Sequence, residues 1–129
     1  MSEPPMVLVV EDEYYIKADL EQVLNDAGFA TEAASSGEEA LTLFAGDTKK
    51  YKALITDVRL NDALDGWEVA RHLRETEPAL PVIYVTGSTA EEWAAHGVPN
   101  SILIQKPFAR AQLISAVSNL LNIGTSPTT

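Results

Sequence analysis

The chain has 129 residues, of which 46% are hydrophobic and 22% charged, and this composition is typical of a single globular domain. Nine Lys and Arg residues against nineteen Asp and Glu residues give a net charge of −10, which disfavours binding to nucleic-acid phosphates and to anionic membranes. The chain has no cysteine for a disulfide or a thiolate metal site, and it has neither a long apolar run nor a signal-peptide pattern, so we expect a cytoplasmic protein that binds neither nucleic acid nor membrane.

Short apolar runs alternate with amphipathic segments along the chain. Met6 to Val10 is an apolar run that ends at two acidic residues, and it predicts a strand buried on both faces. Apolar residues then recur at helical spacing from Glu13 to Ala27, and Gly28 follows where a helix C-terminus favours a left-handed residue. The same alternation predicts, in chain order, a strand at 29–34, a helix from the Ser36 cap to about 45, a strand at 53–56, a helix at 66–77, a strand at 81–85, a short helix after Thr89, a strand at 102–104 and a helix at 109–121.

Polar residues mark the starts of three of these helices. Ser36 with Glu39, and Thr89 with Glu92, each form a capping-box pattern. Asp65 is placed to cap the third helix.

Five strands alternating with five helices predict a series of βαβ units. Right-handed crossovers then give one parallel sheet with helices on both faces, so the expected fold is an α/β doubly wound sandwich. We expect the domain to span residues 6–122, with a disordered N-terminal tail at 1–5 and, at 123–129, a C-terminal tail or the start of a linker.

The residues that follow the predicted strands are chemically coherent. Ligands of doubly wound sheets bind beyond the carboxyl ends of the strands. The residues at these ends are Glu11 and Asp12 after the first strand, Asp57 after the third, Thr86 after the fourth and Lys106 after the fifth. Each one alone has an ordinary explanation, such as a solvated strand end or a helix cap, and their combination is what indicates a site.

The chemistry of this combination favours phosphoryl transfer. Two unit charges about 4 Å apart repel by about 4 kcal/mol at an effective dielectric constant near 20, so three converging carboxylates need an offsetting charge. Mg²⁺ suits one or two carboxylates with waters and phosphoryl oxygens. An aspartate can act as the nucleophile, while the cation and a lysine ammonium balance the charge on the transferring oxygens.

These residues resemble the CheY-like receiver domain of bacterial two-component response regulators, and the resemblance extends from Val7 to Leu121. The family has an acidic pair, an aspartate, a Ser or Thr, and a Lys-Pro pair after its first, third, fourth and fifth strands, and the matching residues are Glu11, Asp12, Asp57, Thr86, Lys106 and Pro107. The resemblance implies a flavodoxin-like (βα)5 fold with a five-stranded parallel sheet in the order 2-1-3-4-5. It also implies a cis peptide bond before Pro107.

The resemblance further implies a role for each matched residue. Asp57 is expected to accept a phosphoryl group, and Thr86 and Lys106 are expected to contact the phosphoryl oxygens. Mg²⁺ is the expected cofactor, and its expected ligands are Glu11, Asp12, Asp57 and the backbone carbonyl of Arg59. The chain would then not be an enzyme with a separate substrate, although it would contribute Mg²⁺-dependent catalysis to its own phosphorylation and dephosphorylation.

Three positions and one loop depart from the family pattern. Leu103 stands where the family usually has an aromatic residue that is coupled to the hydroxyl of the fourth strand, which puts the usual switch in doubt. Arg59 and Ser88 occupy the positions that tune the phosphoryl lifetime, and neither suits the orientation of an attacking water, so we expect slow hydrolysis. The loop after Asp57 is one residue longer than usual and has Asn61 where proline is common.

The leading hypothesis is a phosphorylation-dependent binding module. Its phosphoryl donor would be a histidine kinase or a histidine phosphotransfer protein, and its output would be a downstream protein target. A homodimer through the fourth helix, fifth strand and fifth helix is a further possibility for this surface. The sequence leaves open whether the chain is a stand-alone regulator or a receiver excised from a larger protein.

Three alternatives remain beside this hypothesis. A pseudo-receiver or adaptor that acts without phosphorylation is the main rival, because Leu103 and the longer loop are atypical. A haloacid-dehalogenase-like phosphatase would need a second aspartate where Arg59 stands. A flavodoxin-like cofactor carrier would bring an anionic phosphate close to Glu11 and Asp12, which would repel it.

Three aromatic residues lie near these segments. Tyr14 and Tyr15 are expected to border the site, with at least one of them covering the core. Trp93 is equally consistent with packing and with contact to a partner protein.

Overall fold

The computed structural model describes residues 3–61 and 63–121, and within them it has five strands and five helices in strict alternation. The elements are β1 (Met6–Val10), α1 (Tyr14–Asp26), β2 (Ala30–Ala34), α2 (Gly37–Gly46), β3 (Tyr51–Thr56), α3 (Gly66–Thr76), β4 (Val82–Thr86), α4 (Ala90–His96), β5 (Ser101–Gln105) and α5 (Arg110–Leu121). The strands form one sheet in the order β2-β1-β3-β4-β5, and every neighbouring pair is parallel. The expected flavodoxin-like fold and strand order are therefore confirmed.

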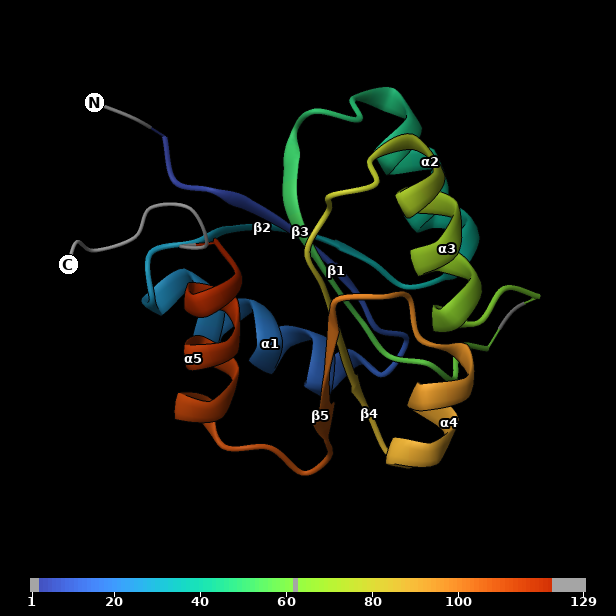
Figure 1. Ribbon diagram of the computed structural model, residues 1–129. Helices are drawn as coiled ribbons and strands as arrows, with labels where there is room; N and C mark the ends of the chain where they lie inside the picture. Colours follow the sequence, from blue (N-terminus) through green and yellow to red (C-terminus); the bar gives the residue numbers. More distant parts are fainter. Residues whose placement is uncertain (1–2, 62, 122–129) are drawn as a thin grey trace, which may run out of the picture.

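Helices cover both faces of the sheet. Figure 1 shows α2, α3 and α4 on one side and α1 and α5 on the other. Side chains along each strand alternate between two separate cores, because successive residues of a strand point to opposite faces. On β1, Leu8 packs in the core beneath α2 and α3, whereas Val7 and Val9 pack in the core beneath α1 and α5. All three are fully buried, which explains the continuous apolar run of this central strand.

The helix ends largely follow the sequence signals. Gly28 has a φ of 99°, as expected of a left-handed residue after α1, and Asp65 caps α3. Thr89 and Glu92 form a complete capping box. The box expected for α2 is only half formed, because the carboxylate of Glu39 reaches one residue further back and accepts from the Ser35 N–H at 2.8 Å.

Some boundaries differ from the sequence prediction by one or two residues. β3 begins at Tyr51 rather than Ala53, because Tyr51 still pairs with Met6 across a register irregularity at the start of the strand. α1 begins at Tyr14, since the Glu13 side chain accepts from the Ile16 N–H at 2.8 Å and acts as the cap.

The start of α3 lies directly against the end of β3. A Cβ atom added to Gly66 would lie 1.9 Å from the backbone oxygen of Asp57, so only glycine fits at this approach. The Gly66 N–H donates to the Val58 carbonyl at 2.7 Å, which fixes the helix start to the residue after Asp57.

The ends of the chain lie largely beyond what the structure describes. The C-terminal tail expected at 123–129 lies outside the described residues, as do the first two residues of the N-terminal tail expected at 1–5. Among the helices of the described part, none combines the length and the apolar character needed to cross a membrane.

Candidate functional site

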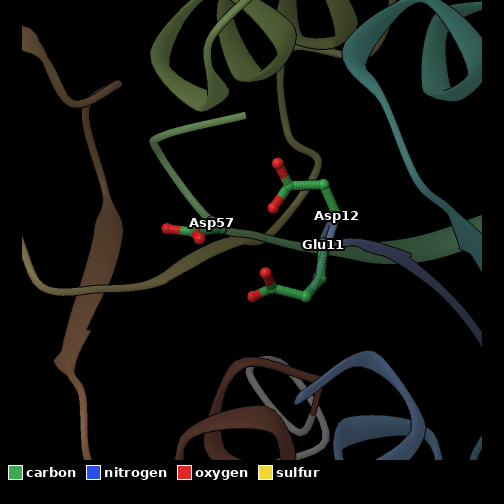
Figure 2. Close-up of side chains that lie close together, drawn as sticks. All are labelled: Glu11, Asp12 and Asp57. Carbon is green, nitrogen blue, oxygen red and sulfur yellow. The ribbon is translucent and has the colours of Figure 1, made fainter. Parts of the chain in front are cut away.

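An acidic cluster lies where β1 and β3 end side by side. Val10 pairs with Thr56 in the register of these strands, and the Asp57 N–H donates to the Val10 carbonyl at 2.9 Å. Glu11, Asp12 and Asp57 follow directly, and each offers a carboxylate oxygen within 4.8 Å of those of the other two. Figure 2 shows the three carboxyl groups gathered beyond the two strand ends. The structure therefore brings these three carboxylates together, as the sequence predicts.

Lys106 completes the cluster from the end of β5. Its Nζ donates to Glu11 Oε1 and to Asp57 Oδ2, each at 3.0 Å. Burial disfavours the charged amine, but the hydrogen bonds and charges of Asp57 and Glu11 outweigh this effect and raise the pKa of Lys106. The ammonium is therefore held firmly in its charged form between two carboxylates.

Burial has the opposite consequence for Glu11. Its side chain is 1% exposed, and this desolvation, reinforced by the charge of Asp57, raises the pKa of the Glu11 carboxyl even though the Lys106 hydrogen bond opposes the shift. Its second oxygen, Oε2, accepts from the Glu13 N–H at 3.1 Å. Both oxygens of Glu11 are thus held in place from different directions.

Asp57 is held in one orientation at a largely buried position. Its Oδ1 accepts from the Val58 N–H at 2.6 Å and its Oδ2 from Lys106, while the residue is 8% exposed. Both contacts are charge-assisted hydrogen bonds, which hold the carboxylate more firmly than neutral ones.

The donor set of this cluster fits a hard divalent cation. The formal charges of three carboxylates and one ammonium sum to −3 + 1 = −2, which one divalent cation balances. Oxygen ligands from few carboxylates, with room for water, are what Mg²⁺ prefers. Asp12 is half-buried, and no hydrogen bond or ion pair to its carboxylate is found among the described residues, so its oxygens can serve as ligands.

Thr86 and Ser88 border the site from the end of β4. Both are buried, with 1% and 2% exposure, and the Thr86 Oγ1 accepts from the Ser88 N–H at 3.3 Å and lies 3.4 Å from Ser88 Oγ. The Lys106 N–H donates to the Thr86 carbonyl at 2.9 Å, and this backbone hydrogen bond fixes the ends of β4 and β5 relative to each other. In the structure the Thr86 hydroxyl is engaged by Ser88.

The other predicted residues lie at the margin of the site. The Arg59 side chain is 79% exposed and reaches Glu92 at 3.8 Å, and the role of its backbone carbonyl stays a prediction. Leu103 is half-buried against the core under α3 and α4, directly opposite Tyr84 of β4. The expected cis peptide between Lys106 and Pro107 is confirmed.

The tyrosines require a correction. Tyr14 and Tyr15 are 67% and 76% exposed, so the expectation that one of them covers the core is wrong. They begin α1 on its outer side and pack edge to face on each other, with ring centroids 5.2 Å apart. Trp93, by contrast, is half-buried, and its Nε1–H donates to Ser101 Oγ at 2.9 Å.

A shallow apolar crevice adjoins the acidic cluster. It has a volume of about 460 Å³ and is lined by Tyr15, Ile16, Asp19, Lys106, Pro107 and Phe108. Lys106 thus links the interior of the site to an exposed apolar surface.

One polar residue of this region was missed by the sequence reasoning. Gln105 pairs with Thr86 across the β4–β5 register, and its Nε2 donates to the Ser88 carbonyl at 2.9 Å. The signal that could have found it is its place directly before Lys106, because the residue before a strand-end lysine on a parallel strand has the neighbouring strand end opposite it.

Comparisons with known proteins agree with this geometry. Residues 7–118 match the family model of the response regulator receiver domain. The chain is 35% identical over 120 residues to the response regulator MprA of Mycolicibacterium vanbaalenii, covering 92% of this chain and 51% of the relative. The chain thus spans about half the length of the curated relatives it matches.

Solved structures give the same result. A response regulator receiver protein from Sinorhizobium medicae is 44% identical, with a TM-score of 0.89 and coverage of 93% of this chain and 96% of that one. A putative response regulator from Chloroflexus aurantiacus is 30% identical, with a TM-score of 0.82 and coverage of 92% and 98%.

Proposed function

This chain belongs to the response regulator receiver domain family of two-component signalling, and from that premise we propose that it accepts a phosphoryl group on Asp57 and thereby switches a protein-binding surface. The observation that carries the proposal is the position of Asp57, whose carboxylate lies among Glu11, Asp12 and the Lys106 ammonium. Such an arrangement combines a nucleophile with charges that balance a transferring phosphoryl group.

The proposed reaction uses the side chains in distinct roles. A carboxylate oxygen of Asp57 attacks the phosphorus of a phosphohistidine on a histidine kinase or phosphotransfer protein, the P–N bond breaks, and the imidazole leaves with its electron pair. Lys106 neutralises charge on the phosphoryl oxygens, and Thr86 donates its hydroxyl hydrogen to one of them.

We propose Mg²⁺ as the cofactor of this step. Glu11, Asp12, Asp57 and the Arg59 carbonyl would hold it. When bound, it would supply positive charge that stabilises the phosphoryl oxygens during transfer. The net charge of the acidic cluster supports this assignment.

The wider context of the domain is part of the proposal. We take the receiver as residues 6–122 with short flanking tails, acting in the cytoplasm on a downstream protein target and without direct contact to nucleic acid or membrane. The match over residues 7–118 supports these limits. Attachment to a further domain, as the length of the relatives suggests, and a homodimer through α4, β5 and α5 are compatible with the same switch.

A small-molecule phosphodonor tests this function. With acetyl phosphate and Mg²⁺, wild type is expected to gain the mass of one phosphoryl group, and Asp57→Asn is expected to gain none. Removal of Mg²⁺ with EDTA should abolish the gain in wild type. Asp26→Asn, which alters an exposed aspartate paired with Arg110, is the matched control and should behave as wild type. An unmodified wild type with several donors would favour the pseudo-receiver instead.

A further inference from the structure

Gln105 lies opposite Thr86 on the neighbouring strand β5. The two residues are partners in the β4–β5 register, as are Leu103 and Tyr84 two residues earlier. Leu103 and Tyr84 pack in the core under α3 and α4, and side chains two residues apart on a strand share a face. Gln105 and Thr86 therefore lie side by side on the face toward α4.

Gln105 also holds the loop that follows Thr86. Its Nε2 donates to the Ser88 carbonyl at 2.9 Å, and among the described residues this side-chain hydrogen bond joins β5 to the segment between β4 and α4. Ser88 is 2% exposed, and buried carbonyls are rarely left without a donor. The bond thus gives the loop a defined position relative to Lys106.

Ser88 in turn engages the hydroxyl of Thr86. It donates its N–H to Thr86 Oγ1 at 3.3 Å, and its own hydroxyl lies 3.4 Å from that oxygen. A threonine hydroxyl has one hydrogen, so it cannot serve Ser88 and a phosphoryl oxygen at the same time. Use of this hydrogen at Asp57 requires Thr86 to give up its hydrogen bond to Ser88 Oγ.

We propose that Gln105 is a positioning residue that latches the β4–α4 loop in the conformation in which Ser88 engages Thr86, and that capture of a phosphoryl group breaks the Gln105–Ser88 hydrogen bond. This inference rests on the proposed function. It assigns to a polar residue at the end of β5 the coupling that the aliphatic Leu103 cannot supply through a hydrogen bond.

Binding of beryllofluoride in the presence of Mg²⁺ tests the latch, because this ion imitates a phosphoryl group on a carboxylate. Gln105→Leu should bind it about three- to tenfold more tightly than wild type, since the bond no longer has to be broken; this corresponds to about 0.7 to 1.4 kcal/mol. Affinity for Mg²⁺ alone should not change. Gln112→Leu, which alters an exposed glutamine on α5, is the matched control.

The wild-type protein supplies a second, spectroscopic test. In an NMR spectrum, the side-chain amide signal of Gln105, assigned by its loss in Gln105→Leu, should be displaced from that of the exposed Gln112. Addition of Mg²⁺ and beryllofluoride should move it toward the position of a solvated amide. This readout does not depend on the folding of any variant.

The outcomes separate this inference from the function it rests on. Equal or weaker binding by Gln105→Leu, or an unmoved Gln105 signal, overturns the latch if wild type binds beryllofluoride and Asp57→Asn does not. If wild type binds no better than Asp57→Asn, the proposed function fails and the latch falls with it.

Discussion

Glu11 has two opposing roles in the cluster. Its carboxylate contributes negative charge for a cation and holds Lys106 at 3.0 Å, yet it does so from a fully buried position. Burial first, and the charge of Asp57 second among the unfavourable effects, raise its pKa. Glu11 therefore holds Lys106 in the site, while its buried negative charge lowers the stability of the metal-free fold.

The pH dependence of stability should reveal this conflict. A carboxyl whose pKa is raised on folding stabilises the fold below its unfolded pKa, near 4.5, and loses that contribution as the pH rises through the raised value. The free energy of unfolding of wild type minus that of Glu11→Gln should therefore fall between pH 4 and neutrality. Denaturant unfolding in EDTA at a series of pH values measures it.

A suitable control for this experiment is Gln22→Asn on the exposed side of α1, which changes no titratable group, so that the difference should stay flat over the same range. A difference for Glu11→Gln that grows with pH would mean that Lys106 outweighs burial, and it would contradict a raised pKa of Glu11.

The junction between β3 and α3 is the element on which the geometry of Asp57 depends. α3 starts with a capping box of Asp65 and Glu68, and Gly66 then brings the helix into contact with the Asp57 backbone. The approach leaves no space for a side chain, because the atoms that a Cβ would meet belong to the backbone and cannot rotate away. The position of the helix start is therefore tied to that of the strand end.

Gly66→Ala should thus displace this junction. We expect it to lower the free energy of unfolding by about 1–3 kcal/mol, as overpacking does, and to slow phosphorylation by acetyl phosphate because Asp57 shifts. Gly46→Ala is the matched control: Gly46 ends α2, and no heavy atom lies within 4 Å of its added Cβ. It should be neutral or stabilising by up to about 1 kcal/mol. Urea unfolding compares the two, and equal effects would disprove the steric argument.

At the scale of the whole molecule, an apolar surface lies next to the acidic edge. The crevice beside Lys106 is lined in part by Tyr15, whose exposed ring packs against the exposed ring of Tyr14, while the chain carries a net charge of −10. Exposed aromatic residues are favoured at protein interfaces. A protein donor that brings a phosphohistidine to Asp57 can bury this surface, whereas a small donor does not need it.

Tyr15→Ala should separate the two kinds of donor. Transfer from a phosphorylated histidine kinase or phosphotransfer protein that acts on wild type should slow about tenfold, since interface aromatics often contribute more than 1 kcal/mol. Phosphorylation by acetyl phosphate should remain within about twofold of wild type. Quenched reactions with labelled donor measure the two transfer rates. Equal slowing with the two donors would instead indicate that the substitution disturbs the site around Asp57.

Local sequence patterns were sufficient to predict the strands and helices and most of the residues at the acidic edge. The apolar run before Glu11 and the one before Asp57 each end abruptly, and strand ends in a parallel sheet meet at one edge, so the sequence alone predicts that these side chains lie together. Capping signals such as Thr89 with Glu92 worked for the same reason, because they act within one turn of a helix.

Contacts between distant segments were decided by the tertiary structure. That Lys106 lies between Glu11 and Asp57, that Gln105 reaches Ser88, and that Tyr15 faces solvent all depend on which strands are neighbours, on their register and on the direction of each helix. These contacts join residues that lie up to 95 positions apart in the sequence. Their positions follow from the packing of two cores on one sheet, and packing depends on the whole chain rather than on any short pattern within it.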